Sequence, residues 1–161
     1  MVTSLAVAAL VACEFDPDER TRFAEHGIEL QAPRTWSITG FSKTVWPERL
    51  VAASYDVRPA DVEGDCGGLA AVRRLPRDGA YVVLIDYGQV GEQEGFTDRL
   101  PVMLGDGALA EYECFGHSYM FRFILSGRAL QAHVAFGRNA TMERREEALG
   151  VLTSITVARE E

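Results

Sequence analysis

The chain has 161 residues, 16 of them basic and 24 acidic, so its formal net charge is −8. This is the length of one domain, and the composition, 47% hydrophobic and 25% charged, is that of a globular protein. The acidic excess argues against binding to nucleic acid or to an anionic membrane surface, because both require clustered Lys and Arg. No apolar run reaches the ~20 residues that span a bilayer.

The first 12 residues are uncharged and mainly apolar, and Cys13 follows them. Such a segment has the length of the apolar core of a secretory signal and is too short for a membrane-spanning helix. Its end, Leu10-Val11-Ala12-Cys13, resembles the lipobox of bacterial lipoproteins. The resemblance implies cleavage before Cys13, lipidation of its thiol, and a single domain over residues 14–161 that is anchored at the membrane outside the cytoplasm.

No positively charged residue precedes the apolar segment, although a secretory signal requires one. Two other interpretations therefore stay open. In the first of these, residues 1–12 are the end of a longer transmembrane helix. In the second, they are the first strand or helix of the folded domain. The signal and the transmembrane helix both place residues 14–161 outside the cytoplasm.

The folded part is predicted to begin with a helix over residues 17–26, with Pro17 in its first turn and Gly27 ending it. His26 then lies at the helix end, where a cation is favourable. Alternation of apolar and polar residues predicts the next three elements. They are strands over 28–32, 35–39 and 50–57.

A helix and a strand are predicted in the middle of the chain. Leu69, Val72 and Leu75 recur at helical spacing, which predicts a short helix over residues 65–75. Residues 80–87 form a dense apolar run after an Asp-Gly turn and are typical of a central strand.

The clearest local signal is a hairpin over residues 118–137, with Ser126-Gly127 as its two-residue turn. If Leu125 faces Arg128, one face of the hairpin is apolar except at its tip. That face carries Tyr119, Phe121, Phe123 and Leu125 against Arg128, Leu130, Ala132 and Val134. A one-residue slip would bury the mixed face instead, so the apolar face fixes the register. On the mixed face, His133 is expected to be a solvated surface residue.

A helix over residues 141–152 is predicted next, with Thr141 or Asn139 as its N-cap. Its apolar stripe is expected to consist of Met142, Ala148, Leu149 and Leu152. A strand over 154–157 ends the domain.

This order of elements implies an α+β fold in which an antiparallel sheet of six to seven strands packs against one or two helices. Residues 27–36, an apolar strand followed by Pro33 and Trp36, resemble the opening of the PsbP-like fold. Residues 127–155 resemble its closing strand, helix and strand. The group includes many small secreted lipoproteins of high-GC Gram-positive bacteria, and some members bind other proteins. The resemblance brings no catalytic residues.

If Cys13 carries lipid, the two remaining cysteines, Cys66 and Cys114, form an even pair in an oxidising compartment. A disulfide between them would close a loop of 48 residues (114 − 66) and stabilise the fold by about 4 kcal/mol. The alternative is two unrelated buried thiols, which behave as small apolar groups.

The remaining chemical signals are weak. Cys114 and His117 form one C-x-x-H pair, whereas a structural zinc site shows two close ligand pairs, so we expect no metal. A cysteine nucleophile with His117 as its base lacks any local signature. The loop 86–98 is rich in Gly and acidic residues but does not match a calcium-binding loop. We expect no catalytic residues and no cofactor.

The sequence favours a non-enzymatic, envelope-anchored domain that binds a protein or an apolar ligand. Three aromatic residues are candidates for a ligand groove, although aromatic residues in a sheet more often belong to the core. They are Trp36, Trp46 and Tyr55. The rival hypothesis is a small cytoplasmic enzyme or accessory domain that uses Cys114 and His117.

Overall fold

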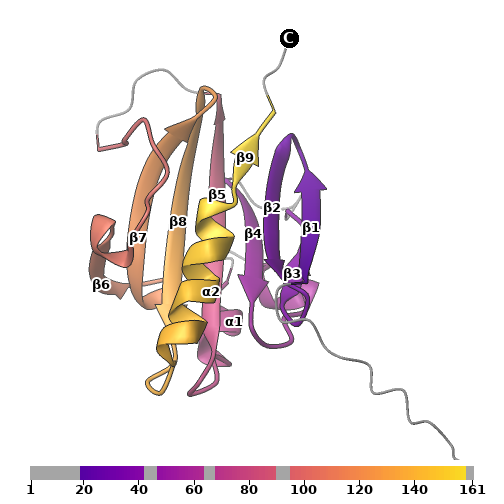
Figure 1. The fold of residues 1–161 in the computed structure, drawn as a ribbon, viewed down its shortest axis with the longest axis vertical. Helices are drawn as coiled ribbons and strands as arrows, with labels where there is room; N and C mark the ends of the chain where they lie inside the picture. Colours follow the sequence, from indigo (N-terminus) through magenta and orange to yellow (C-terminus); the bar gives the residue numbers. More distant parts are fainter. Residues whose placement is uncertain (1–18, 42–46, 64–67, 90–94, 159–161) are drawn as a thin grey trace, which may run out of the picture.

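The computed structural model describes residues 19–41, 47–63, 68–89 and 95–158. They form an α+β fold of antiparallel strands and two α-helices, which confirms the predicted class (Figure 1). The described residues form nine strands, divided between a six-stranded and a three-stranded sheet, whereas the sequence suggested six to seven strands in one sheet.

The elements of the larger sheet are given in their spatial order. They are β3 (Ser37–Thr39), β4 (Glu48–Ala53), β5 (Ala80–Gln89), β8 (Arg128–Phe136), β7 (Gly116–Leu125) and β6 (Ala108–Tyr112). The smaller sheet has the order β1 (Arg20–Glu25), β2 (Ile28–Pro33) and β9 (Thr156–Val157). The helices are α1 (Leu69–Arg73) and α2 (Met142–Thr153), with 3₁₀ turns η1 (Pro59–Asp61) and η2 (Leu104–Asp106).

The β7–β8 hairpin has the predicted register. Leu125 pairs with Arg128, Phe123 with Leu130 and Tyr119 with Val134. Ser126 and Gly127 both take positive φ, 51° and 82°, as a two-residue turn requires.

The helix predicted over residues 17–26 is wrong, because Arg20–Glu25 form strand β1. This strand pairs along its whole length with β2, and His26 and Gly27 make the turn with φ of 52° and 73°. The local preference for a helix is weak, and backbone pairing with β2 stabilises the strand more. His26 is therefore a turn residue, and its Nδ1 lies 2.7 Å from Oε2 of Glu48.

Helix α2 covers one face of the large sheet, as Figure 1 shows. Thr141 is its N-cap, with Oγ1 accepting from the backbone N–H of Arg144 at 3.2 Å. Ala148, Val151 and Leu152 face the core, but Met142 is 70% exposed, which corrects the predicted stripe. Met142 precedes Ala148 by six residues. At about 100° of rotation per residue, the two side chains therefore point about 120° apart around the helix axis.

The opposite face of the sheet is also covered, by α1 and the chain that precedes it. Two separate buried clusters result, so β5 is buried on both faces from Ala80 to Asp86. This explains why its sequence is a continuous apolar run, and it confirms the predicted central strand. The edge strand β6 was not expected, because its sequence, ALAEY, has little strand preference.

Candidate functional site

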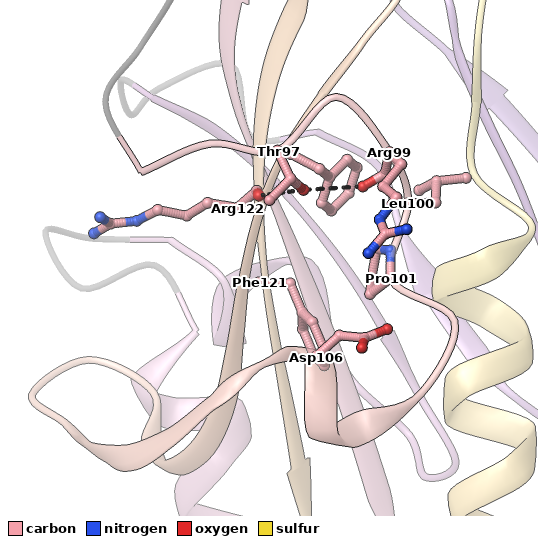
Figure 2. Close-up of a pocket in the computed structure, with 8 residues that line it drawn as sticks. Thr97, Arg99, Leu100, Pro101, Asp106, Phe121 and Arg122 are labelled. Atoms are coloured by element: carbon pink, nitrogen blue, oxygen red, sulfur yellow. Dashed lines mark hydrogen bonds between the residues drawn. The ribbon is translucent and has the colours of Figure 1, made fainter.

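A small pocket lies between β7 and the segment that crosses it, residues 97–106, which we call the strap. The cavity has a volume of about 150 Å³. Its lining comprises Thr97, Arg99, Leu100, Pro101, Asp106, Phe121, Arg122 and Phe123. Figure 2 shows the Phe121 ring facing the strap, whereas the Arg122 side chain points away and lines the pocket with its backbone.

Two sets of hydrogen bonds hold the strap in place. Thr97 forms two backbone hydrogen bonds with β7. The N–H of Thr97 donates to the carbonyl of Arg122 at 3.1 Å, and the N–H of Ile124 donates to the carbonyl of Thr97 at 2.7 Å. At the other end, Asp106 Oδ2 accepts from the N–H groups of Val102 at 2.8 Å and Met103 at 3.1 Å. These two bonds hold the pKa of the Asp106 carboxyl below its usual range. The strap is thus a fixed part of the pocket wall.

Gly107 lets the end of the strap lie directly on the Phe121 ring. A Cβ atom at this position would be 2.6 Å from Phe121 Cε1, closer than two carbon atoms can approach. By contrast, a Cβ at Gly105 would have its nearest neighbour, Met103 Sδ, at 4.0 Å. The pocket geometry therefore depends on glycine at position 107 and not at position 105.

Exposed apolar side chains gather on the strap and on the strand after it. Among the described residues, the large apolar side chains that are exposed are Val102 at 70%, Met103 at 57%, Leu109 at 49% and Met142 at 70%. Three of the four fall within residues 102–109, beside the pocket. A concentration of exposed apolar side chains marks a contact surface more often than a scatter of single ones does.

A second cavity, of about 230 Å³, lies on the same face of the β7–β8 hairpin. We call it the arginine groove. Its lining residues are Leu109, His117, Tyr119, Val134, Phe136, Gly137, Arg138 and Arg145. Tyr119 and Phe136 meet edge to face at 6.2 Å, and the Arg145 guanidinium lies over the Phe136 ring at 4.7 Å. The groove therefore combines an aromatic floor with cationic side chains.

The predicted surface position of His133 is wrong, because its side chain is only 1% exposed. The mixed face of the hairpin is covered, and Phe115 stacks on the imidazole at 4.1 Å. His133 Nδ1 lies 3.2 Å from Ser118 Oγ, and its Nε2 lies 2.8 Å from Gln131 Nε2. Burial, with a smaller effect of the Arg122 charge, lowers the pKa of His133 to about 4.

The direction of these hydrogen bonds gives the Ser118–His133 pair a structural role. Gln131 Oε1 accepts from Arg122 Nε at 3.1 Å, so its amide nitrogen donates to His133 Nε2. His133 then carries its proton on Nδ1 and donates to Ser118. A general base needs the reverse, with the serine donating to the imidazole. Ser118 is also only 1% exposed, so a substrate does not reach its hydroxyl in this conformation.

Two of the three aromatic residues proposed for a ligand groove, Trp36 and Tyr55, lie on opposite faces of the large sheet. Trp36 is 6% exposed and packs in the cluster under α2, with Nε1 donating to Glu147 at 3.3 Å. Tyr55 packs against the cluster on the opposite face and donates to the carbonyl of Ala71 at 2.6 Å. Burial raises the pKa of Tyr55. Trp46 lies outside the described residues.

The sequence candidates that carry sulfur and imidazole are also separated. Cys114 packs beside Tyr112 and Phe115 against the second cluster, whereas His117 lies on the other face of β7 with Tyr119 and is 3.7 Å from Glu111. Cys13 and Cys66 lie outside the described residues, so lipidation and the disulfide stay predictions. The described part of the chain contains no cluster of three or more His, Cys, Asp or Glu side chains able to hold a metal ion.

The chain matches no protein-family model, and no curated protein matches it either. Within the described ranges, no helix has both the length and the hydrophobicity needed to cross a membrane. The features that bear on function are the strap pocket, the arginine groove and the N-terminal sequence. Sequence reasoning did not find either cavity. The one available signal was the apolar face of the predicted hairpin, which is the floor of both.

Proposed function

We propose that this protein is a protein-binding domain of the bacterial cell envelope, held at the membrane through a lipid on Cys13. The observation that carries the binding role is the concentration of exposed apolar side chains at Val102, Met103 and Leu109, beside the strap pocket. The anchored location is supported by the sequence Leu10-Val11-Ala12-Cys13. The resemblance to small secreted PsbP-like lipoproteins is part of the same proposal.

The size of the pocket favours a protein partner over a free apolar ligand. Pockets for drug-sized ligands have volumes of about 300 to 1,000 Å³, whereas the strap pocket has about 150 Å³. A single apolar side chain fits this volume. Protein interfaces concentrate their binding energy in such anchor side chains, which fill a pocket and are ringed by further apolar contacts. Val102 and Met103 would supply that ring.

Photo-crosslinking in the membrane fraction tests the binding surface. A diazirine amino acid is placed at Met103, at Leu109 or, as the matched control, at Met142, which is more exposed than either but lies on α2. We expect positions 103 and 109 to crosslink the same protein and position 142 not to. Equal crosslinking from all three positions would mean that the strap is not a preferred surface.

The anchor is tested separately by the mass of the protein from membranes. We expect a chain that begins at Cys13 and carries diacylglycerol, and we expect Cys13→Ala to release the domain from the membrane. An unmodified Cys13 with residues 1–12 still attached would exclude the lipoprotein hypothesis, whatever the crosslinking shows.

A further inference from the structure

We propose that the arginine groove is a binding site for a carboxylate that carries an apolar group the size of a side chain. This inference goes beyond the proposed function, because it needs neither the lipid anchor nor Val102 and Met103 of the strap, although the groove shares Leu109 with the proposed binding surface. It depends on three observations, namely a cavity, an aromatic floor and two arginines that form no salt bridge with any described carboxylate.

The floor and wall of the groove are apolar and come from three adjacent strands. Leu109 on β6 pairs with Tyr119 on β7, and Tyr119 pairs with Val134 on β8. Phe136 extends the same face by two residues along β8. Leu109 is 49% exposed, so apolar surface remains open to solvent at this site. An apolar group in the cavity of about 230 Å³ would remove that surface from water.

Arg145 is positioned to bind an anion edge-on. Its guanidinium lies over the Phe136 ring at 4.7 Å, so one planar face is used by the aromatic ring. The N–H donors of a guanidinium lie in its plane and remain available for a carboxylate in a two-bond arrangement. Among the described residues, Arg145 forms no salt bridge, whereas its neighbour Arg144 is paired with Glu147.

Arg138 is held at the groove by the residue that precedes it. The backbone N–H of Gly137 donates to the carbonyl of Gly79 at 2.9 Å. A Cβ at Gly137 would lie 2.1 Å from the carbonyl oxygen of Pro76, so only glycine permits this close approach. The chain leaves β8 along a fixed path, with Arg138 exposed on the groove wall and without a salt bridge to any described residue.

The charge of the groove is opposite to that of the whole chain. The formal net charge is −8, yet two arginines, Arg138 and Arg145, line this cavity, and its described lining contains no acidic residue. Glu111, which pairs with His117 across β6 and β7, is the carboxylate beside the groove, with its Oε2 at 3.7 Å from His117 Nδ1. An anionic ligand would meet attraction from the arginines and a smaller repulsion from Glu111.

The test measures binding of defined probes to the isolated chain by NMR titration of backbone amides. One arm uses 3-phenylpropionate and its neutral amide, 3-phenylpropionamide. A second arm uses the peptide acetyl-Gly-Gly-Phe with a free C-terminal carboxylate and the same peptide as its amide. We expect each acid to bind about tenfold or more tightly than its amide, because hydrogen bonds to charged groups are the strong ones. If 3-phenylpropionate binds more tightly than the peptide acid, the natural ligand is a free carboxylic acid. If the peptide acid binds more tightly, the ligand is the C-terminal end of a peptide chain.

Three variants locate the effect. Arg145→Gln should weaken acid binding about tenfold and leave amide binding unchanged. Arg144→Gln is the matched control, one residue away on the same helix but already paired with Glu147, and it should not change acid binding. Glu111→Gln should strengthen acid binding. Urea unfolding of each variant verifies that it is folded at the titration temperature.

Two affinity results would overturn the inference, and the pattern of NMR shifts gives a third test. One is equal affinity of the acid and the amide in both arms. The other is equal weakening by Arg144→Gln and Arg145→Gln, which would show that only the general charge of the helix matters. Shifts at the amides of Tyr119 and Phe136 on acid binding would support the site, and shifts confined to other strands would exclude it.

Discussion

Arg128 pairs with the buried carboxylate of Asp86 and at the same time binds the turn of the other sheet. Its Nε lies 3.4 Å from Asp86 Oδ1, Nη2 contacts Oδ2, and Nη1 donates to the carbonyl of His26. The side chains are 13% and 3% exposed. One guanidinium therefore connects β5 and β8 of the large sheet to the β1–β2 hairpin.

Substitution of Arg128 should lower the free energy of unfolding more than substitution of an exposed arginine does. Arg128→Met leaves the Asp86 carboxylate buried and unpaired, and we expect urea unfolding to show a loss of about 3 to 5 kcal/mol. Arg22→Met is the control, since the Arg22–Glu29 pair is exposed and should contribute less than about 1 kcal/mol. Equal losses in the two variants would mean that the Arg128–Asp86 pair is not the main connection between the sheets.

Gly107→Ala should destabilise the protein and disturb the strap pocket. The added methyl group would overlap the Phe121 ring, so we expect a loss of about 1 to 3 kcal/mol in urea unfolding. Gly105→Ala, two residues earlier and in open space, should be near neutral. Near-neutral Gly107→Ala with unchanged Phe121 NMR shifts would contradict the close contact.

The buried imidazole of His133 should make stability fall in mild acid. Its pKa is lowered to about 4 in the folded protein, against an ordinary value of 6.5, so the unfolded chain takes up a proton that the folded chain excludes. Stability is fully present above pH 6.5 and is lost as the pH falls toward 4. Between pH 7.5 and 5 the loss from this residue should be about 2 kcal/mol.

Urea unfolding of wild type and His133→Gln at the two pH values isolates this contribution. The variant should lose about 2 kcal/mol less than wild type between pH 7.5 and 5, whatever its stability at pH 7.5. An NMR titration of His133 with a midpoint near 6.5 would refute the prediction.

A disulfide between Cys66 and Cys114 should appear in protein isolated from the envelope. Peptide mapping without reductant should recover the two cysteines on one linked peptide, and Cys66→Ser should lower the free energy of unfolding by about 4 kcal/mol. The same variant compared under reducing conditions is the control and should match reduced wild type. Rapid alkylation of both thiols in the native protein would instead support the hypothesis of separate cysteines.

Local sequence was sufficient where an element and its partner are adjacent in the chain. The Ser126-Gly127 turn and the alternating residues on both sides predicted the β7–β8 pairing residue by residue, including Leu125 with Arg128. Thr141 as the cap of α2 was equally local. The apolar run over residues 80–87 indicated a central strand, and this also was confirmed.

Prediction failed where a distant element decides the outcome. Arg20–Glu25 have a helix-like sequence, but backbone pairing with β2 makes them a strand. His133 alternates with apolar residues and so suggested an exposed position, but Phe115 and the chain around α1 cover that face. Ala108–Tyr112 form a strand because β7 offers them an open edge.

The class of fold and the register of the β7–β8 hairpin could be predicted from the amino-acid sequence, because they depend on periodicity and turn residues; the anchor at Cys13 stays a prediction from a short motif. Which faces of the sheet are covered could not be predicted, and the folded arrangement was needed to show that Trp36 and Tyr55 are separated and that His133 is buried. It also brought Arg138 and Arg145 to the cavity beside Tyr119. Cavities form between elements that are remote in the chain, and no local pattern encodes the distance between them.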